Sequence, residues 1–329
     1  MTEIYERSPT RVDLAGGTLD CWPLYLFLRD PVVVSLAIDV FTHCWIEPRP
    51  GTEIEIGSDD LGVCKRYAGL SAALLDSEPG LALARAQLAY WKPPGGFRLR
   101  TKSESPMGGG LGGSSSLCIS MIKAFSRWLD RPLDLHRAAL VASHLEAQVL
   151  RKPTGTQDYF PPLLGGLCLI DYGVDGPRAT SLPLPRGLFD ERFALVTTGR
   201  SHHSGINNWQ VIKAALDGDA AVLSALEELA EISSVMRAAF EASAWTRLPE
   251  LFLREYEART ALSKGFSSPE IVALQALAQR HGAVAKICGA GGGGCVMIWC
   301  PDRQAPAVRE ACAARGFPAL AAMPWEPDV

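Results

Sequence analysis

The 329-residue sequence predicts a protein of two packed lobes, each built from both strands and helices. The chain is long for one domain, and β-branched strand patterns occur along it together with amphipathic helical patterns. A segment with three prolines and three glycines, residues 173–190, separates two such regions. We therefore expect an N-terminal lobe over residues 1–180 and a C-terminal lobe over residues 181–329.

The first half of the chain opens with strand patterns. Residues 10–47 favour strands, and the β-branched run at 32–38 follows an Asp30-Pro31 turn signal. Residues 96–102 alternate apolar and basic side chains, which predicts a half-buried strand.

Two helices and a short strand follow. The apolar stripe of residues 114–129 predicts a helix whose serine-rich first turn suits N-capping. A second helix is expected over about residues 134–150, with Asp134 as its N-cap, and Pro153 and Gly155 then interrupt the helical pattern. Residues 167–172 form a short strand pattern.

The second half is mainly helical between two groups of strands. Residues 193–198 favour a strand, and residues 207–281 are rich in helix formers. Within that region a helix is expected to start at Ser267-Ser-Pro-Glu270 and to stop at His281-Gly282. Strand patterns at 284–287 and 296–300 enclose a run of glycines.

Composition fits a soluble globular enzyme, with 47% hydrophobic and 21% charged residues. A net charge of −4 and the lack of a basic run argue against nucleic-acid and membrane partners. The nine cysteines are scattered without a C-x-x-C pair, which disfavours zinc or disulfide frameworks and indicates a reducing compartment. The charged N-terminus does not read as a signal peptide, so we expect a cytoplasmic protein.

The glycine-rich segment Pro106-Met-Gly-Gly-Gly-Leu-Gly-Gly-Ser-Ser-Ser-Leu117 runs directly into a predicted helix. Glycines let backbone N–H groups approach an anion, so this pattern favours a phosphate cradle over a flexible surface turn. It lacks the Gly-Lys-Ser/Thr of a Walker loop and the distant acidic residue of a dinucleotide fingerprint. We expect it to bind a nucleotide through Pro106, Gly108, Gly109, Gly110, Leu111, Gly112, Gly113, Ser114, Ser115 and Ser116.

Two acidic residues downstream complement this loop. A Mg²⁺ ion on the nucleotide phosphates needs a carboxylate, and phosphoryl transfer to a hydroxyl benefits from a second one. The candidates are Glu146, inside an otherwise apolar helix, and Asp158, just past the end of that helix, although each alone could be a solvated surface residue. We predict that one of these carboxylates holds Mg²⁺ together with a loop serine, either Ser114 or Ser115.

Two further segments fit the acceptor side. Arg11-Val-Asp-Leu-Ala-Gly-Gly-Thr-Leu-Asp20 could be an ordinary turn, or could place Arg11 against the transferred phosphoryl group and Asp20 against substrate hydroxyls. The run Gly289-Ala-Gly-Gly-Gly-Gly-Cys295 is either a tight hairpin or a backbone that approaches another loop or the phosphates closely.

The segment Thr198-Gly-Arg-Ser-His-His-Ser204 is expected to line the substrate mouth rather than to bind metal, because adjacent histidines point apart in regular structure. Arg200, His202 and His203 are candidates for binding a distal phosphate on the acceptor.

Together these motifs resemble the GHMP kinase superfamily, whose three motifs appear here in order, at residues 11–20, 106–115 and 286–294. The resemblance implies an α+β two-lobe fold, with an N-terminal lobe like a ribosomal-protein fold and a C-terminal α/β sandwich. It also implies a small-molecule kinase that uses ATP and Mg²⁺. By the same resemblance Asp158 matches the catalytic base, Arg11 the catalytic cation, and Glu146 with Ser114 or Ser115 the Mg²⁺ ligands.

Within that family, Ala15-Gly-Gly17 followed by Asp20, together with Gln157-Asp158, is similar to sugar 1-kinases of the heptose-7-phosphate kinase and L-fucokinase type. Galactokinases carry Glu-His where this chain has Gly17-Thr18. The resemblance implies transfer to the anomeric C1 hydroxyl of a sugar or sugar phosphate. Acceptor contacts are expected at Gly16, Gly17, Thr18, Asp20, Gln157, Gly199, Arg200, Gly291 and Gly292.

Two alternative functions stay open beside this one. Leu19, Thr156 and Tyr159 depart from the residues usual in those sugar kinases, which leaves the identity of the sugar open. A non-sugar alcohol such as mevalonate or homoserine is an alternative acceptor. A non-catalytic nucleotide or sugar sensor is another alternative, which the acidic residues and loop serines disfavour. The sequence leaves the oligomeric state open, with a homodimer as one option.

Overall fold

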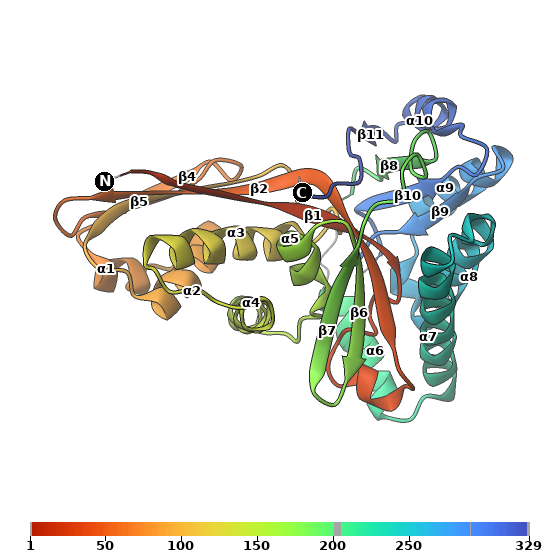
Figure 1. The fold of residues 1–329 in the computed structure, drawn as a ribbon, viewed down its shortest axis with the longest axis horizontal. Helices are drawn as coiled ribbons and strands as arrows, with labels where there is room; N and C mark the ends of the chain where they lie inside the picture. The colour runs from red at the N-terminus through yellow and green to blue at the C-terminus, as the bar shows by residue number, and fades with distance from the viewer. Residues whose placement is uncertain (1, 201–204, 290, 328–329) are drawn as a thin grey trace.

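The computed structural model describes residues 2–200, 205–289 and 291–327. Within these residues the chain forms two sheets, one from strands between residues 4 and 182 and one from strands between residues 193 and 320. Figure 1 shows the long first sheet extending away from the C-terminal sheet and its helices. This arrangement confirms the expected α+β fold with two lobes.

The first sheet has the order β4-β3-β5-β2-β6-β7, with β1 pairing along β2. Its central strand β2 pairs with β5 through residues 42–49 and with β6 through residues 32–36. All pairs are antiparallel except β3 with β5. The strands are β1 (Ile4–Ala15), β2 (Val32–Arg49), β3 (Ile54–Ser58), β4 (Val63–Tyr67), β5 (Gly96–Ser103), β6 (Leu167–Gly173) and β7 (Gly176–Leu182).

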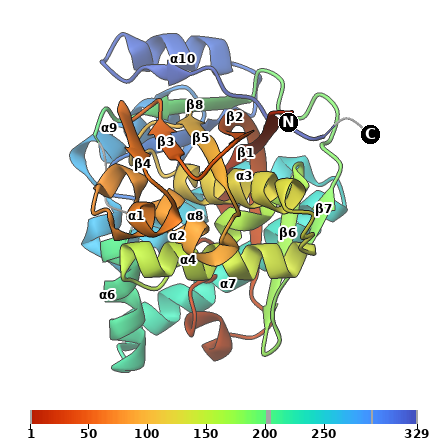
Figure 2. The same ribbon diagram turned by 90° about the vertical axis from the view of Figure 1, so that its left-hand side faces the viewer.

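Helices α1 to α4 cover one face of this sheet, as Figures 1 and 2 both show. Buried side chains of α3 such as Phe125 pack there with Phe97 of β5 and Leu145 of α4. Asp134 caps α4 by accepting a hydrogen bond from Arg137 N at 2.8 Å, as expected. The helices are α1 (Leu70–Leu75), α2 (Ala82–Trp91), α3 (Gly113–Trp128), α4 (Leu135–Leu150) and α5 (Phe160–Leu164), with 3₁₀ turns at Leu24–Phe27, Pro79–Leu81 and Gln157–Tyr159.

The second sheet has the order β11-β8-β10-β9 and is wholly antiparallel. Its strands are β8 (Phe193–Thr197), β9 (Val284–Ile287), β10 (Cys295–Trp299) and β11 (Ala319–Leu320). Its helices are α6 (Gly205–Leu216), α7 (Ala220–Glu241), α8 (Leu248–Leu262), α9 (Pro269–Arg280) and α10 (Ala305–Ala313), with 3₁₀ turns at Trp245–Arg247 and Lys264–Phe266. Ser268 caps α9 through Ile271 N, within the segment expected to start a helix.

One apolar core joins the two lobes. Leu14 of β1 and Val34 of β2 share a buried cluster with Leu229 and Met236 of α7 and Trp299 of β10. Burying such side chains together removes apolar surface from water, so the lobes are held against each other. The relative position of the segments that carry the site is therefore fixed by the core.

The segment that was expected to separate the lobes contains strand β7 at residues 176–182, which pairs with β6. Most of this strand is exposed or half-buried, so its sequence carries little of the apolar alternation by which strands are recognised. The division between residues 180 and 181 stays a prediction. None of the helices in the described parts of the chain combines the length and hydropathy of a membrane span.

Candidate active site

A cleft of about 640 Å³ brings together segments from all three sequence motifs. Its lining combines the loop before α3, the C-terminal part of α4 with the turn that follows, and residues of β1, α6 and α8. The predicted site residues that line it are Arg11, Thr18, Asp20, Pro106, Gly108, Gly109, Gly110, Leu111, Gly112, Gly113, Ser114, Ser115, Glu146, Gln157, Asp158 and Gly291.

The glycine-rich loop delivers the N-terminus of α3 to this cleft. Gly112 is the N-cap of α3 and has a φ of 69°, a left-handed conformation that glycine adopts without strain. The expected capping by serine is wrong, because no side chain caps this helix. The first N–H groups of a helix have no intrahelical partner, and here they belong to residues that line the cleft. A phosphate would satisfy them and would meet the positive end of the helix dipole.

The two glycine-rich segments lie backbone to backbone. Cys295 N donates a hydrogen bond to the carbonyl of Gly109 at 2.8 Å. A Cβ on Gly110 would overlap the carbonyl of Cys288, and one on Gly289 would lie 2.9 Å from the carbonyl of Gly110. The close approach expected for the second segment is therefore confirmed, and it is an approach to the first loop.

Arg11 and Asp158 form an ion pair beside that loop. Arg11 Nε donates to Asp158 Oδ1 at 2.8 Å, and Nη2 lies 2.6 Å from the same oxygen. Arg11 Nη1 also donates to the carbonyl of Gly110 at 2.6 Å, which ties the cation to the loop. Burial lowers the pKa of Arg11, but the charges of Asp158 and Asp13 outweigh burial and the net direction is upward. The guanidinium thus stays charged in a nearly dry position.

Glu146 lies at the inner side of the cleft and is almost fully buried. Ser115 Oγ donates to its Oε2 at 2.6 Å and the Tyr159 hydroxyl donates to the same oxygen at 2.7 Å. Burial raises the pKa of Glu146, while hydrogen bonds from Ser114, Ser115 and Tyr159 oppose this rise. In the described chain, no lysine or arginine lies within ion-pair distance of this carboxylate.

The Glu146 carboxylate and the neighbouring serine hydroxyls fit a magnesium ion. A buried carboxylate without a cationic neighbour is costly, and carboxylate and hydroxyl oxygens are hard ligands that suit Mg²⁺. Mg²⁺ usually binds through one or two protein groups together with substrate phosphates and water. No cluster of three acidic, histidine or cysteine ligands occurs in the described residues.

Asp20 enters the cleft from the turn after β1 and is 3% exposed. Its Oδ2 accepts a hydrogen bond from Gln157 N at 3.1 Å. A Cβ on Gly155 would overlap this carboxylate, so the turn after α4 passes directly against it. Burial, together with the charge of Asp158, raises the pKa of Asp20 to about 7. This carboxyl can therefore gain or lose a proton near neutral pH.

Ser116 is a correction to the expected nucleotide site. Its hydroxyl contacts Thr42 Oγ1 and the carbonyls of Ser8 and Pro9 inside the first lobe. Its N–H donates to the carbonyl of Gly112. Neither group is free for a phosphate, because the third serine of the run has turned with the helix toward the sheet.

Five expected acceptor residues also lie outside the cleft lining, namely Gly16, Gly17, Gly199, Arg200 and Gly292. Gly17 packs against Asp13 and Arg259, where any Cβ would overlap the Asp13 carboxylate. Gly292 N donates to the carbonyl of Phe266. Arg200 is exposed and pairs with Glu270 at 2.8 Å, which directs its charge to α9. His202 and His203 lie outside the described residues.

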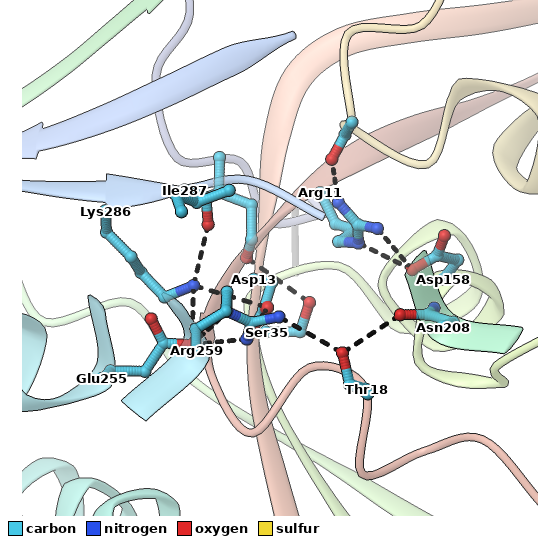
Figure 3. Close-up of polar contacts among 12 residues, drawn as sticks. Arg11, Asp13, Thr18, Ser35, Asp158, Asn208, Glu255, Arg259, Lys286 and Ile287 are labelled. Atoms are coloured by element: carbon cyan, nitrogen blue, oxygen red, sulfur yellow. Dashed lines mark hydrogen bonds and ion pairs between the residues drawn. The ribbon is translucent and has the colours of Figure 1, made fainter. Parts of the chain in front are cut away.

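A buried cluster of four charged residues adjoins the cleft and was not foreseen from the sequence (Figure 3). Arg259 Nη2 lies 2.8 Å from Asp13 Oδ2, and Arg259 Nε donates to Glu255 Oε1 at 2.7 Å. Lys286 Nζ lies 3.4 Å from Asp13 Oδ2 and 3.3 Å from Glu255 Oε1. All four side chains are at most 1% exposed.

The sequence offered partial signals for this cluster. Asp13 lies two residues after Arg11 on the same strand and so points to the same side of it. Lys286 belongs to the third motif, but Glu255 and Arg259 form an i,i+4 pair of a kind that usually lies on an exposed helix face. Burial raises the pKa of Asp13, but Lys286, Arg259 and Arg11 outweigh this and lower it.

Comparison with known families agrees with this geometry. The family described as GHMP kinases N terminal domain matches residues 80–166, and GHMP kinases C terminal matches residues 236–318. The two matches together cover about half of the chain and contain the first glycine-rich loop, both acidic candidates and the second glycine-rich segment. The chain belongs to the GHMP kinases.

Two of the relatives are sugar kinases by their names, and mevalonate kinases are also among the relatives. The chain is 27% identical over 305 residues to the D-glycero-alpha-D-manno-heptose 7-phosphate kinase of Campylobacter jejuni, covering 89% of this chain and 88% of that protein. It is 25% identical to the L-fucokinase/L-fucose-1-P guanylyltransferase of Bacteroides fragilis, covering 92% of this chain but 35% of that protein. The structure of a D-glycero-D-manno-heptose 1-phosphate kinase from Bacteroides thetaiotaomicron shares the fold, with a TM-score of 0.76, 20% identity and coverage of 99% and 100% of the two chains.

Proposed function

We propose that this protein is an ATP-dependent sugar kinase that phosphorylates the anomeric C1 hydroxyl of a sugar or sugar phosphate of the heptose 7-phosphate or fucose type. The observation that carries the proposal is the Arg11–Asp158 ion pair, which lies in one cleft with the glycine-rich loop and with Asp20. Similarity to a heptose 7-phosphate kinase and to a fucokinase supports the acceptor class.

In this proposal the phosphates of ATP rest on main-chain N–H groups of the loop and of the first turn of α3. The acceptor oxygen forms a bond to the γ-phosphorus while the bond to the bridging oxygen breaks, which releases ADP. Asp158 orients the hydroxyl and accepts its proton, and Arg11 stabilises negative charge on the transferred group. Most of the rate acceleration would then come from positioning and electrostatics.

Glu146 and Ser114 or Ser115 would hold Mg²⁺, whose charge when bound neutralises the phosphate oxygens. Ser115 donates a hydrogen bond to Glu146, and the Tyr159 hydroxyl donates one to the same carboxylate oxygen. These hydrogen bonds hold the carboxylate in one orientation at the inner side of the cleft.

Asp20 is the proposed anchor for hydroxyl groups of the acceptor. Gln157 N fixes one of its carboxylate oxygens, and a carboxylate accepts hydrogen bonds readily from neighbouring hydroxyls of a polyol. The same charge would repel an acceptor that carries a carboxylate close to the reacting hydroxyl.

The test is release of ADP from ATP and Mg²⁺ against a panel of heptose 7-phosphate, L-fucose, other free sugars, mevalonate and homoserine. Turnover on one sugar, with phosphate located on C1 by phosphorus NMR, is the expected result. Turnover on mevalonate or homoserine alone would retain the kinase mechanism and reject the role of Asp20. ATP binding without turnover on any acceptor would favour a nucleotide or sugar sensor.

A further inference from the structure

We propose that Arg259 is a positioning residue for the acceptor, because it holds Thr18 and thereby fixes the turn that presents Asp20 to the cleft. This inference rests on the proposed function, since it assumes that Asp20 contacts the acceptor. It assigns a role to the buried charged cluster formed by Asp13, Glu255, Arg259 and Lys286.

The backbone of Thr18 has an unusual conformation. Its φ is 80°, a left-handed conformation that is unfavourable for a β-branched residue. Such a conformation persists only where surrounding contacts determine it. Thr18 is 3% exposed and lies between Gly17 and Asp20 in a turn closed by Leu19 N on the Gly16 carbonyl at 3.1 Å.

Two hydrogen bonds hold the Thr18 side chain. Arg259 Nη1 donates to Thr18 Oγ1 at 3.5 Å, and Thr18 Oγ1 donates to Asn208 Oδ1 at 3.2 Å. Figure 3 shows Arg259 and Asn208 on opposite sides of this hydroxyl. The single hydroxyl therefore links helix α8 to helix α6 across the turn.

Arg259 itself is held in place by the buried charged cluster. Two of its nitrogens bind Asp13 and Glu255, and the four-residue cluster has two positive and two negative charges, so its net charge is zero. Gly17 leaves room for these contacts, because a Cβ there would overlap Asp13 and lie 2.9 Å from Arg259 Nη2. A buried guanidinium fixed in this way can act as a rigid point for the turn.

Arg259, Thr18, Asn208 and Asp20 all line the cleft, whereas the phosphate loop is held by separate contacts with Cys288 and Cys295. A loss of the Thr18 contact should therefore affect the acceptor and leave the nucleotide nearly unaffected. A residue that served only general stability would not produce this separation.

The experiment compares Thr18→Val, which keeps the shape and removes the hydroxyl, with Thr18→Ser, which restores it. For Thr18→Val we expect the KM for the sugar to rise about ten-fold or more, while the KM for ATP changes by less than about two-fold. Thr18→Ser should lie near the wild type. Arg259→Lys keeps the positive charge but loses the planar guanidinium that binds several partners at once. It should therefore raise the sugar KM in the same way. Arg254→Lys, on the same helix in a partly buried ion pair with Glu228, is the matched control.

A sugar KM for Thr18→Val equal to that of the wild type would overturn the inference. An equal rise of both KM values would also overturn it, because that result indicates a general structural role. If Arg259→Lys fails to fold, the Thr18 pair still decides the outcome. A wild-type protein without turnover on any sugar would instead reject the proposed function, and the inference with it.

Discussion

The two carboxylates of the acceptor region have different surroundings at the residue scale. Asp158 faces the guanidinium of Arg11, whereas Asp20 is bound by the N–H of Gln157 and has no lysine or arginine within ion-pair distance in the described chain. Carboxylates whose surroundings differ in this way commonly divide tasks in an active site. We therefore propose that the reacting hydroxyl binds at Asp158 and the remaining hydroxyls bind at Asp20.

Replacing Asp158 tests its assignment directly. Asp158→Asn keeps the shape and one hydrogen bond to Arg11 but cannot accept the hydroxyl proton. We expect kcat to fall by about 10²–10⁴ while calorimetry shows nearly unchanged binding of ATP. Near-normal turnover would contradict the role of Asp158 as the base.

The raised pKa of Asp20 predicts a particular pH dependence of stability. Between its ordinary value of 3.8 and about 7, the folded protein holds a proton that the unfolded chain has lost. This group's contribution to the free energy of unfolding therefore falls as pH rises through that window. Asp20→Asn should remove the effect. The free energy of unfolding of the wild type, minus that of the variant, should therefore decrease by a few kcal/mol from pH 4 to pH 8.

Urea denaturation of the two ligand-free proteins at several pH values measures this difference. A constant difference across the range would mean that Asp20 titrates normally. The proposed role in sugar binding also predicts that the acceptor KM decreases as pH rises through about 7, because the ionised carboxylate accepts more hydrogen bonds.

At the scale of elements, the contact between the two glycine-rich segments is the main constraint on the phosphate end. Gly110 has a φ of 73° and lies against Cys288, whereas Gly62 has a φ of 65° with open space around its missing side chain. Gly62→Ala should cost about 1 kcal/mol for the backbone conformation alone. Gly110→Ala should cost more, because the loop must also move away from Cys288.

Thermal unfolding and the KM for ATP distinguish these two alanine variants. We expect Gly110→Ala to raise the KM for ATP about ten-fold or more, since the N–H groups lose their common orientation. Gly62→Ala should retain the wild-type KM. Equal behaviour of the two variants would show that the contact between the segments does not set the loop.

Elements with strong local signals were predicted well. Helices α3, α4 and α9 have the caps, apolar stripes or glycine signals by which helices are recognised, and their observed bounds agree closely with the expected ones. Strand β7 was not foreseen, because an exposed edge strand lacks alternation. The sequence motifs predicted the cleft residues that lie within them. They did not predict Arg259, because its burial depends on packing between α8 and β1.

At the scale of the whole molecule, the buried cluster joins β1 of the first lobe to α8 and β9 of the second. Lys286→Met would leave Asp13 and Glu255 with one cation between them in a dry position. We expect the free energy of unfolding to fall by about 3–5 kcal/mol. Lys213→Met, which breaks an exposed pair with Asp217, should change it by about 0–1 kcal/mol.

Urea denaturation with tryptophan fluorescence measures both lysine variants. A loss for Lys286→Met no larger than that for Lys213→Met would show that water enters the cluster and replaces the missing charge. A single cooperative transition in the wild type is also expected, because one apolar core joins the lobes.

The back-to-back glycine segments have a consequence for how such an enzyme changes over generations. The proposed phosphate cradle consists of main-chain N–H groups, so it depends on the glycines that let the two segments approach each other and not on the chemistry of a particular side chain. The acceptor end depends instead on a few side chains such as Asp20 and Thr18. Mutation of these side chains can therefore change which acceptor is bound, while the main-chain contacts proposed for the nucleotide stay the same.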